Sequence, residues 1–145
     1  TNRNDDRYEV EEIGDNYYMN EISAAIVLKQ LQKLNKMNSI RKNIAKNYEK
    51  ELQMDMKMPF TQGCSYHLYW IRVKNRKLFR QRMSEKGIQT GTHYKPIHTF
   101  SLYKNKVRLP ITEDVGKQIV TLPIHPNLSE DDIDKIITYT NRCCN

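Results

Sequence analysis

The 145-residue sequence has no long apolar run and few cysteines. Nowhere do eighteen apolar residues follow one another, and no charged segment precedes a short apolar one, so the sequence predicts neither a transmembrane helix nor a signal peptide. The three cysteines are an odd number, and Cys143 and Cys144 are adjacent, where a disulfide would hardly close a useful loop. We therefore expect reduced thiols and a cytoplasmic protein that does not bind membranes.

Motifs for metals, phosphate loops and nucleic acids are also missing. There is no Cys-x2-Cys pair, and the spacing of His93 and His98, on a segment broken by Pro96, lacks the helical geometry of zinc-protease sites. We predict no metal site. The net charge of +7 is compatible with an anionic partner. Because no helix-turn-helix, RNP or zinc-finger signature accompanies that charge, we do not expect nucleic acid to be the partner.

The scarcity of glycine and proline defines one long helix. Neither residue occurs between positions 15 and 58, where apolar side chains recur at steps of three and four: Ala24, Leu28, Leu31, Leu34, Met37, Ile40, Ile44, Tyr48 and Leu52. This pattern predicts an amphipathic helix over about residues 19–53, with Asn20 as its N-cap. At 1.5 Å per residue the helix would reach roughly 50 Å, which is longer than a compact domain of this size covers. We therefore expect it to contact a neighbour.

The remaining sequence alternates between strand and helix patterns. SYHLYWIRV (65–73) and IQTGTHY (88–94) are predicted as strands, the first because it is dense in aromatic and β-branched residues. KLFRQRMSEKG (77–87) and ITEDVGKQIVTL (111–122) are predicted as short helices, and a last helix follows Ser129 as N-cap. The predicted fold class is α+β: a long N-terminal helix followed by a small, mostly antiparallel sheet packed with helices.

The densest group of protonatable side chains lies in GIQTGTHYKPIH (87–98), which contains His93, Tyr94, Lys95 and His98. Two interpretations of this segment stay open on the residues alone. It is either a loop that presents these side chains to a ligand or a loop whose side chains support packing.

Four segments in the same order resemble a known family. GDNYYMNEISAAIVLKQL (14–31) resembles G-Y-N-Y-R-M-N-E-[IL]-x-A-A-I-x-L-x-Q-L, and SYHLYWIRV resembles an S-x-Y-H-L-Y strand. GIQTGTHYKPIH resembles G-I-x-T-x-x-H-Y-x-P-x-H, and TLPIHPNLSEDD (121–132) resembles S-L-P-x-H-P-x-L-[ST]-x-x-[DE]. These are segments of the DegT/DnrJ/EryC1/StrS family of pyridoxal-phosphate-dependent sugar aminotransferases.

The resemblance implies the C-terminal small domain of a fold-type-I aminotransferase, with residues 1–145 as a single domain that includes a leading inter-domain helix. Such enzymes are homodimers that move an amino group from an amino acid, commonly glutamate, to a keto group of a nucleotide-diphosphate sugar. The family places the cofactor lysine in a large domain N-terminal to this segment, and no residue here matches its motif. We therefore expect no catalytic residue in this chain and no activity from the chain alone.

The resemblance also implies roles for individual residues. Asn16 matches an asparagine that reaches the phosphate of the partner subunit's pyridoxal phosphate. His93 and Tyr94 match a pair near the sugar nucleotide, and His98 matches the histidine that follows. Tyr18 stands where the family usually has arginine, which changes a planar cation into a neutral phenol beside the substrate. Without the resemblance, Asn16 would be interpreted as a turn or cap residue.

Two other classes of function stay open. The chain is alternatively a non-catalytic dimerisation or regulatory domain derived from such an enzyme, as the missing lysine motif would favour. A basic module that binds nucleic acid is the weaker alternative, supported by the charge and by aromatic residues among the basic ones.

Overall fold

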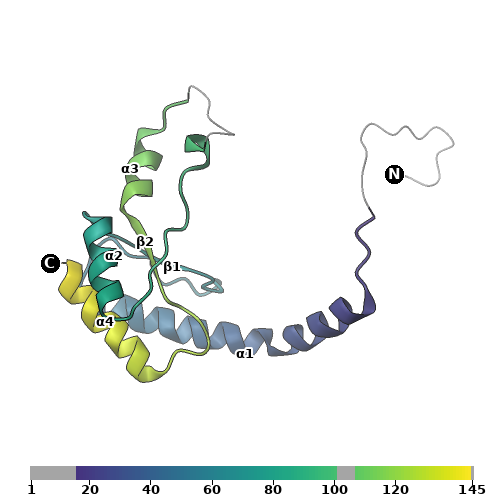
Figure 1. Ribbon diagram of the computed structural model, residues 1–145. Helices are drawn as coiled ribbons and strands as arrows, with labels where there is room; N and C mark the ends of the chain where they lie inside the picture. The colour runs from purple at the N-terminus through teal and green to yellow at the C-terminus, as the bar shows by residue number, and fades with distance from the viewer. Residues whose placement is uncertain (1–15, 101–106, 145) are drawn as a thin grey trace. The chain divides into compact units, whose positions relative to one another are not determined.

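The computed structural model describes residues 16–100 and 107–144. The elements in chain order are α1 (Glu21–Glu51), β1 (Tyr69–Arg72), α2 (Arg76–Glu85), the 3-10 helix η1 (Ile97–Thr99), α3 (Pro110–Gln118), β2 (Ile119–Leu122) and α4 (Glu130–Cys144) (Figure 1). Helices combined with a two-stranded antiparallel sheet confirm the predicted α+β class. The chain divides into two compact units, one ending at Lys33 and the other beginning at Leu34.

Helix α1 is continuous, as the sequence predicts, and both of its ends are capped. The side-chain oxygen of Asn20 accepts a hydrogen bond from the Ser23 amide at 2.8 Å. At the other end, the Asn141 amide donates to the Glu51 carbonyl at 3.0 Å, and the Lys57 ammonium donates to the Glu49 carbonyl at 2.6 Å. These donors satisfy carbonyls that have no partner within the helix.

The core belongs to the second unit. Its buried side chains come from the end of α1, from both strands and from the helices that follow, with Ile44, Tyr48, Tyr69, Phe79, Met83, Val120 and Ile136 among them. The Tyr48 hydroxyl donates to the Pro123 carbonyl at 2.7 Å. Burial raises the pKa of Tyr48 and of Tyr69 well above the ordinary value, so both phenols stay protonated.

The sheet is small, and a single bridge extends each of its edges. Strand β1 pairs with β2 antiparallel, with Tyr69 opposite Leu122 and Arg72 opposite Ile119. An isolated bridge joins Lys57 to the free edge of β1, and another joins Gly91 to the free edge of β2. Segment 88–94, predicted as a strand, thus contributes one bridge residue. Because Gly91 has little strand propensity and Pro96 has no amide hydrogen, nothing favours a longer ladder there.

Two further element boundaries differ from the sequence prediction. The strand predicted over 65–73 begins only at Tyr69, since Tyr66 has a positive φ of 51° that extended backbone does not permit. The helix predicted over 111–122 ends at Gln118, and its last four residues form β2. The run Ile119–Thr121 is β-branched, and pairing with β1 overrides the helical spacing of the preceding residues.

The helices predicted over 77–87 and after Ser129 are confirmed as α2 and α4. Gly87 follows α2 with a φ of 74°, which suits a glycine after a helix C-terminus. Ser129 precedes α4, its hydroxyl accepts from the Asp132 amide at 3.1 Å, and the Asp132 carboxylate accepts from the Ser129 amide at 3.0 Å. Across the described ranges, no helix combines the length and the apolar character that crossing a membrane requires.

Candidate functional site

The segment from Gly91 to Phe100 is anchored to β2 at its start. The Gly91 amide donates to the Thr121 carbonyl at 3.0 Å, and the Thr121 amide donates to the Gly91 carbonyl at 2.9 Å. Two residues later, Nδ1 of His93 lies 2.7 Å from the hydroxyl oxygen of Thr121. The backbone pair and the side-chain contact hold the half-buried His93 ring against the edge of the sheet.

Tyr94 follows His93 and points its ring into solvent. The two rings meet edge to face, with centroids 4.9 Å apart, and the peptide bond between the residues is cis. Tyr94 is 68% exposed, whereas Thr121 behind His93 is 4% exposed. The pair therefore places an available phenol beside an anchored imidazole, which gives a polar ligand two adjacent hydrogen-bonding groups.

His98 is anchored separately, to α3. Its Nε2 lies 3.3 Å from a carboxylate oxygen of Glu113, and the same oxygen accepts from the Leu109 amide at 3.0 Å. The hydrogen bond from the Leu109 amide is the largest cause that holds the pKa of Glu113 below its ordinary value, and the hydrogen bond with His98 is the second. Glu113 is therefore ionised at neutral pH, and it fixes both η1 and the start of α3.

A hollow of about 290 Å³ lies between this segment and α3. Its walls come from Tyr94 and Pro96 on one side and from α3 and the first residue of β2 on the other: Ile111, Thr112, Val115, Gly116 and Ile119. Most of these side chains are apolar. The anchored segment thus combines polar groups on His93, Tyr94 and His98 with an apolar wall beside Tyr94.

Asn16 and Tyr18 belong to the first unit, ahead of α1. Both side chains are exposed, and Tyr18 is 87% exposed. Their amide and phenol groups are therefore available to a ligand or to another chain.

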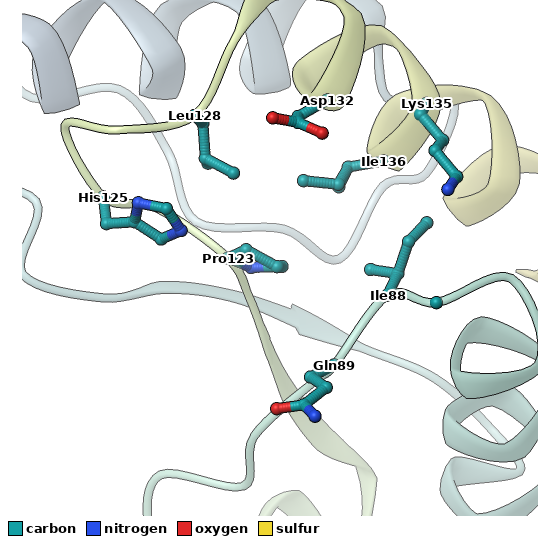
Figure 2. Close-up of a pocket in the computed structure, with 9 residues that line it drawn as sticks. Ile88, Gln89, Pro123, His125, Leu128, Asp132, Lys135 and Ile136 are labelled. Carbon is teal, nitrogen blue, oxygen red and sulfur yellow. The ribbon is translucent and has the colours of Figure 1, made fainter.

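A separate pocket of about 410 Å³ lies between the turn after α2, the segment after β2, and α4 (Figure 2). Its lining includes none of the predicted site residues. Ile88, Leu128 and Ile136 supply apolar surface, while Asp132 and Lys135 lie toward the α4 side. The Asp132 carboxylate accepts from both the amide and the hydroxyl of Ser129, which lowers its pKa, so this group serves to cap the helix.

Within residues 16–100 and 107–144, no three His, Cys, Asp or Glu side chains gather in a way that would hold a metal ion. His93 contacts a hydroxyl and His98 contacts a single carboxylate. The two histidines are therefore placed for hydrogen bonding.

Comparison with known proteins supplies the decisive observation. A sequence model of the DegT/DnrJ/EryC1/StrS aminotransferase family matches residues 1–140. This chain belongs to that family. The similarity predicted from four short segments is thereby confirmed over nearly the whole sequence.

Solved structures of aminotransferases share the fold. A DegT/DnrJ/EryC1/StrS aminotransferase from Brucella abortus is 30% identical with a TM-score of 0.82, and the match covers 96% of this chain and 39% of that one. PseC of Helicobacter pylori, an aminotransferase involved in the biosynthesis of pseudoaminic acid, is 29% identical with a TM-score of 0.81. That match covers 94% of this chain and 40% of PseC. The aminotransferase TlmJ of Streptoalloteichus hindustanus is 28% identical with a TM-score of 0.81, and the match covers 94% of this chain and 40% of TlmJ. The chain thus spans about two fifths of the length of these family members.

Sequence reasoning missed the residues that hold the histidines. Thr121 was part of the TLPIHP segment, but nothing in its pattern predicts a contact with His93 across 28 positions. Glu113 was assigned only to a helix. Both contacts depend on which segments the sheet and α3 bring together, and local periodicity carries no signal of that kind.

Proposed function

We propose that the chain is part of a pyridoxal-phosphate-dependent sugar aminotransferase, which transfers an amino group from an amino acid, commonly glutamate, to a keto group of a nucleotide-diphosphate sugar. The single observation that carries this proposal is the family match over residues 1–140. The enzyme would act in the cytoplasm, in the synthesis of surface polysaccharide or of deoxyaminosugars.

The anchored segment would bind the sugar nucleotide. His93, Tyr94 and His98 offer ring nitrogens and a phenol, which suit the hydroxyls and the diphosphate of a bulky polar substrate. The apolar hollow beside Tyr94 would accept a less polar part of the same molecule. Tyr18, in the position of the family's usual arginine, would give a neutral hydrogen bond in place of a planar cation.

Asn16 would bind the cofactor phosphate in the partner subunit of a homodimer. Its exposed amide fits that role, because an amide N–H is a suitable donor to a phosphate oxygen. Pyridoxal phosphate, when bound, supplies the electron sink that amino transfer needs. We assign no catalytic residue to this chain. Lys29 and Lys33 are exposed on α1, and we propose that the lysine that binds the cofactor comes from sequence beyond the matched two fifths.

A non-catalytic dimerisation or regulatory domain is the second candidate. The observation that favours it is the exposed apolar surface of α1 in the first unit, formed by Ile22, Ile26, Leu28 and Leu31. A surface of this kind is typical of an interaction site. Such a domain would form dimers without binding a cofactor.

An absorbance titration of the encoded full-length protein with pyridoxal phosphate tests the proposal. We expect a band of bound cofactor that disappears on adding glutamate, and no such band from residues 1–145 alone. A full-length protein that dimerises but shows no cofactor band would contradict the aminotransferase proposal and support the second candidate.

A further inference from the structure

The contact between His93 and Thr121 lies inside a closely fitted corner. The two hydrogen bonds between the backbones of Gly91 and Thr121 fix the position of the threonine relative to the segment. His93 then folds back, so that a Cβ added at Gly91 would lie 2.5 Å from Cε1 of His93 and 2.7 Å from the Thr121 hydroxyl oxygen. Only glycine leaves room for the ring to reach the hydroxyl in this arrangement.

The surroundings of the Thr121 hydroxyl bear on which ring nitrogen of His93 carries the proton. Thr121 is 4% exposed, and within the part of the chain that the structure describes its hydroxyl has one hydrogen-bond partner, Nδ1 of His93. If Nδ1 carried the proton and donated it, the hydroxyl hydrogen would be buried without an acceptor, which is costly. If the hydroxyl donates to an unprotonated Nδ1, both groups are satisfied.

We propose that Thr121 is a positioning residue that holds neutral His93 as the tautomer protonated at Nε2. Resting on the proposed function, this makes His93 a hydrogen-bond donor toward an oxygen acceptor of the substrate, such as a diphosphate or hydroxyl oxygen. The two histidines of the segment would then differ in their hydrogen bonding. Nδ1 of His93 is bound to a neutral hydroxyl, whereas Nε2 of His98 is bound to the Glu113 carboxylate.

The tautomer is directly measurable by nitrogen NMR of the full-length protein labelled with 15N in the histidine rings. Spectra are recorded at about pH 8.5, well above the ordinary range of histidine titration. We expect His93 to show one unprotonated nitrogen at Nδ1 and one protonated nitrogen at Nε2. The exposed His67 serves as the internal reference, because among the described residues its ring has no hydrogen-bond partner to select one tautomer. A His93 protonated at Nδ1 would overturn the proposal without the need for any variant.

Substitutions of Thr121 then separate the hydroxyl from the shape of the side chain. In Thr121→Val, which keeps the β-branched shape, we expect the His93 nitrogen signals to move toward the averaged pattern of His67. Thr121→Ser should retain the wild-type tautomer. Gly91→Ala provides a second route, since its Cβ would push the ring away from the hydroxyl. Unchanged His93 signals in Thr121→Val would overturn the proposal.

Thr140→Val is the matched control. Thr140 is also fully buried, but its hydroxyl has no hydrogen-bond partner among the described residues, and it lies in α4. Removing this hydroxyl should leave the His93 spectrum as it is in the wild type. A change equal to that of Thr121→Val would show that the effect is a general response to an altered core, and it would contradict the specific role of Thr121.

Binding of uridine diphosphate, used as a probe, distinguishes this inference from the proposed function. With the net value of one hydrogen bond, Thr121→Val should weaken binding by about threefold to tenfold and Thr121→Ser by less than about twofold. A wild type with the predicted tautomer that binds neither this probe nor thymidine diphosphate would contradict the proposed function but not the tautomer. Equal affinity of Thr121→Val and the wild type would contradict the positioning role.

Discussion

The two parts of α1 both carry apolar residues, but in different surroundings. Ile26, in the first unit, is 57% exposed, whereas Ile44, in the second, is 2% exposed. Ile44 packs in a core that includes Tyr48 and the strands, while the face around Ile26 carries further exposed apolar residues. Periodicity therefore predicts that a helix forms but not what covers it. An exposed apolar face of this kind is typical of an interaction site.

Substituting one isoleucine in each part of α1 by alanine should give the largest difference in stability. Ile44→Ala should lower the free energy of unfolding by about 2–5 kcal/mol, because it removes buried methyl groups and leaves a cavity. Ile26→Ala should change it by less than about 0.5 kcal/mol, since little is buried there. Urea unfolding of residues 1–145 measures both. Equal losses would mean that the two parts of the helix do not differ in the way described.

Two buried tyrosines near the end of α1 and in β1 differ in their hydrogen bonding. Tyr48 and Tyr69 are both fully buried and pack edge to face. Among the residues that the structure describes, the Tyr48 hydroxyl has a hydrogen-bond partner, the Pro123 carbonyl, and the Tyr69 hydroxyl has none. Tyr48→Phe should cost about 1 kcal/mol of stability in urea unfolding, whereas Tyr69→Phe should be neutral or stabilising. If Tyr69→Phe destabilises as much as Tyr48→Phe, the Tyr69 hydroxyl has a partner in solution.

Acid should weaken the second unit at the starts of α3 and α4. In the folded state, hydrogen bonds with Leu109 and His98 lower the pKa of Glu113. Hydrogen bonds with Ser129 lower the pKa of Asp132. A lowered folded pKa contributes stability that is present above the ordinary carboxyl value of about 4 and is lost as the pH falls through the folded value.

Hydrogen exchange at decreasing pH measures this effect, after correction for the intrinsic pH dependence of exchange. Below about pH 4, amides at the starts of α3 and α4 should lose protection, and Asp132→Asn should remove the part of this change that occurs in α4. Protection that is independent of pH at both helix starts would contradict the role assigned to these carboxylates.

Much of the fold was predictable because it is encoded locally. Asn20 and Ser129 act at helix ends through side-chain contacts and Gly87 through its backbone conformation, and the sequence predicted all three. The β2 strand was missed since Ile119–Leu122 continues a helical spacing and becomes extended only when it pairs with β1. That pairing joins residues about 50 positions apart, and no window of local sequence contains both.

The candidate site shows the same division. His93, Tyr94 and His98 were found as a dense group of polar residues, and a family resemblance gave them roles. Their supports, Thr121 and Glu113, come from other segments and became visible only with the fold. The roles of Asn16 and Tyr18 in binding stay predictions.

The most direct test of the central claim separates the two halves of amino transfer in the full-length enzyme. His93→Ala should slow transfer to the keto sugar, or raise its KM, by about tenfold, because one hydrogen bond to the substrate is lost, while the reaction with glutamate stays at the wild-type rate. Gln81→Ala, an exposed change on α2, is the control and should alter neither half. Equal losses in both halves for His93→Ala, or no loss in the sugar half, would contradict the claim that this segment binds the sugar substrate.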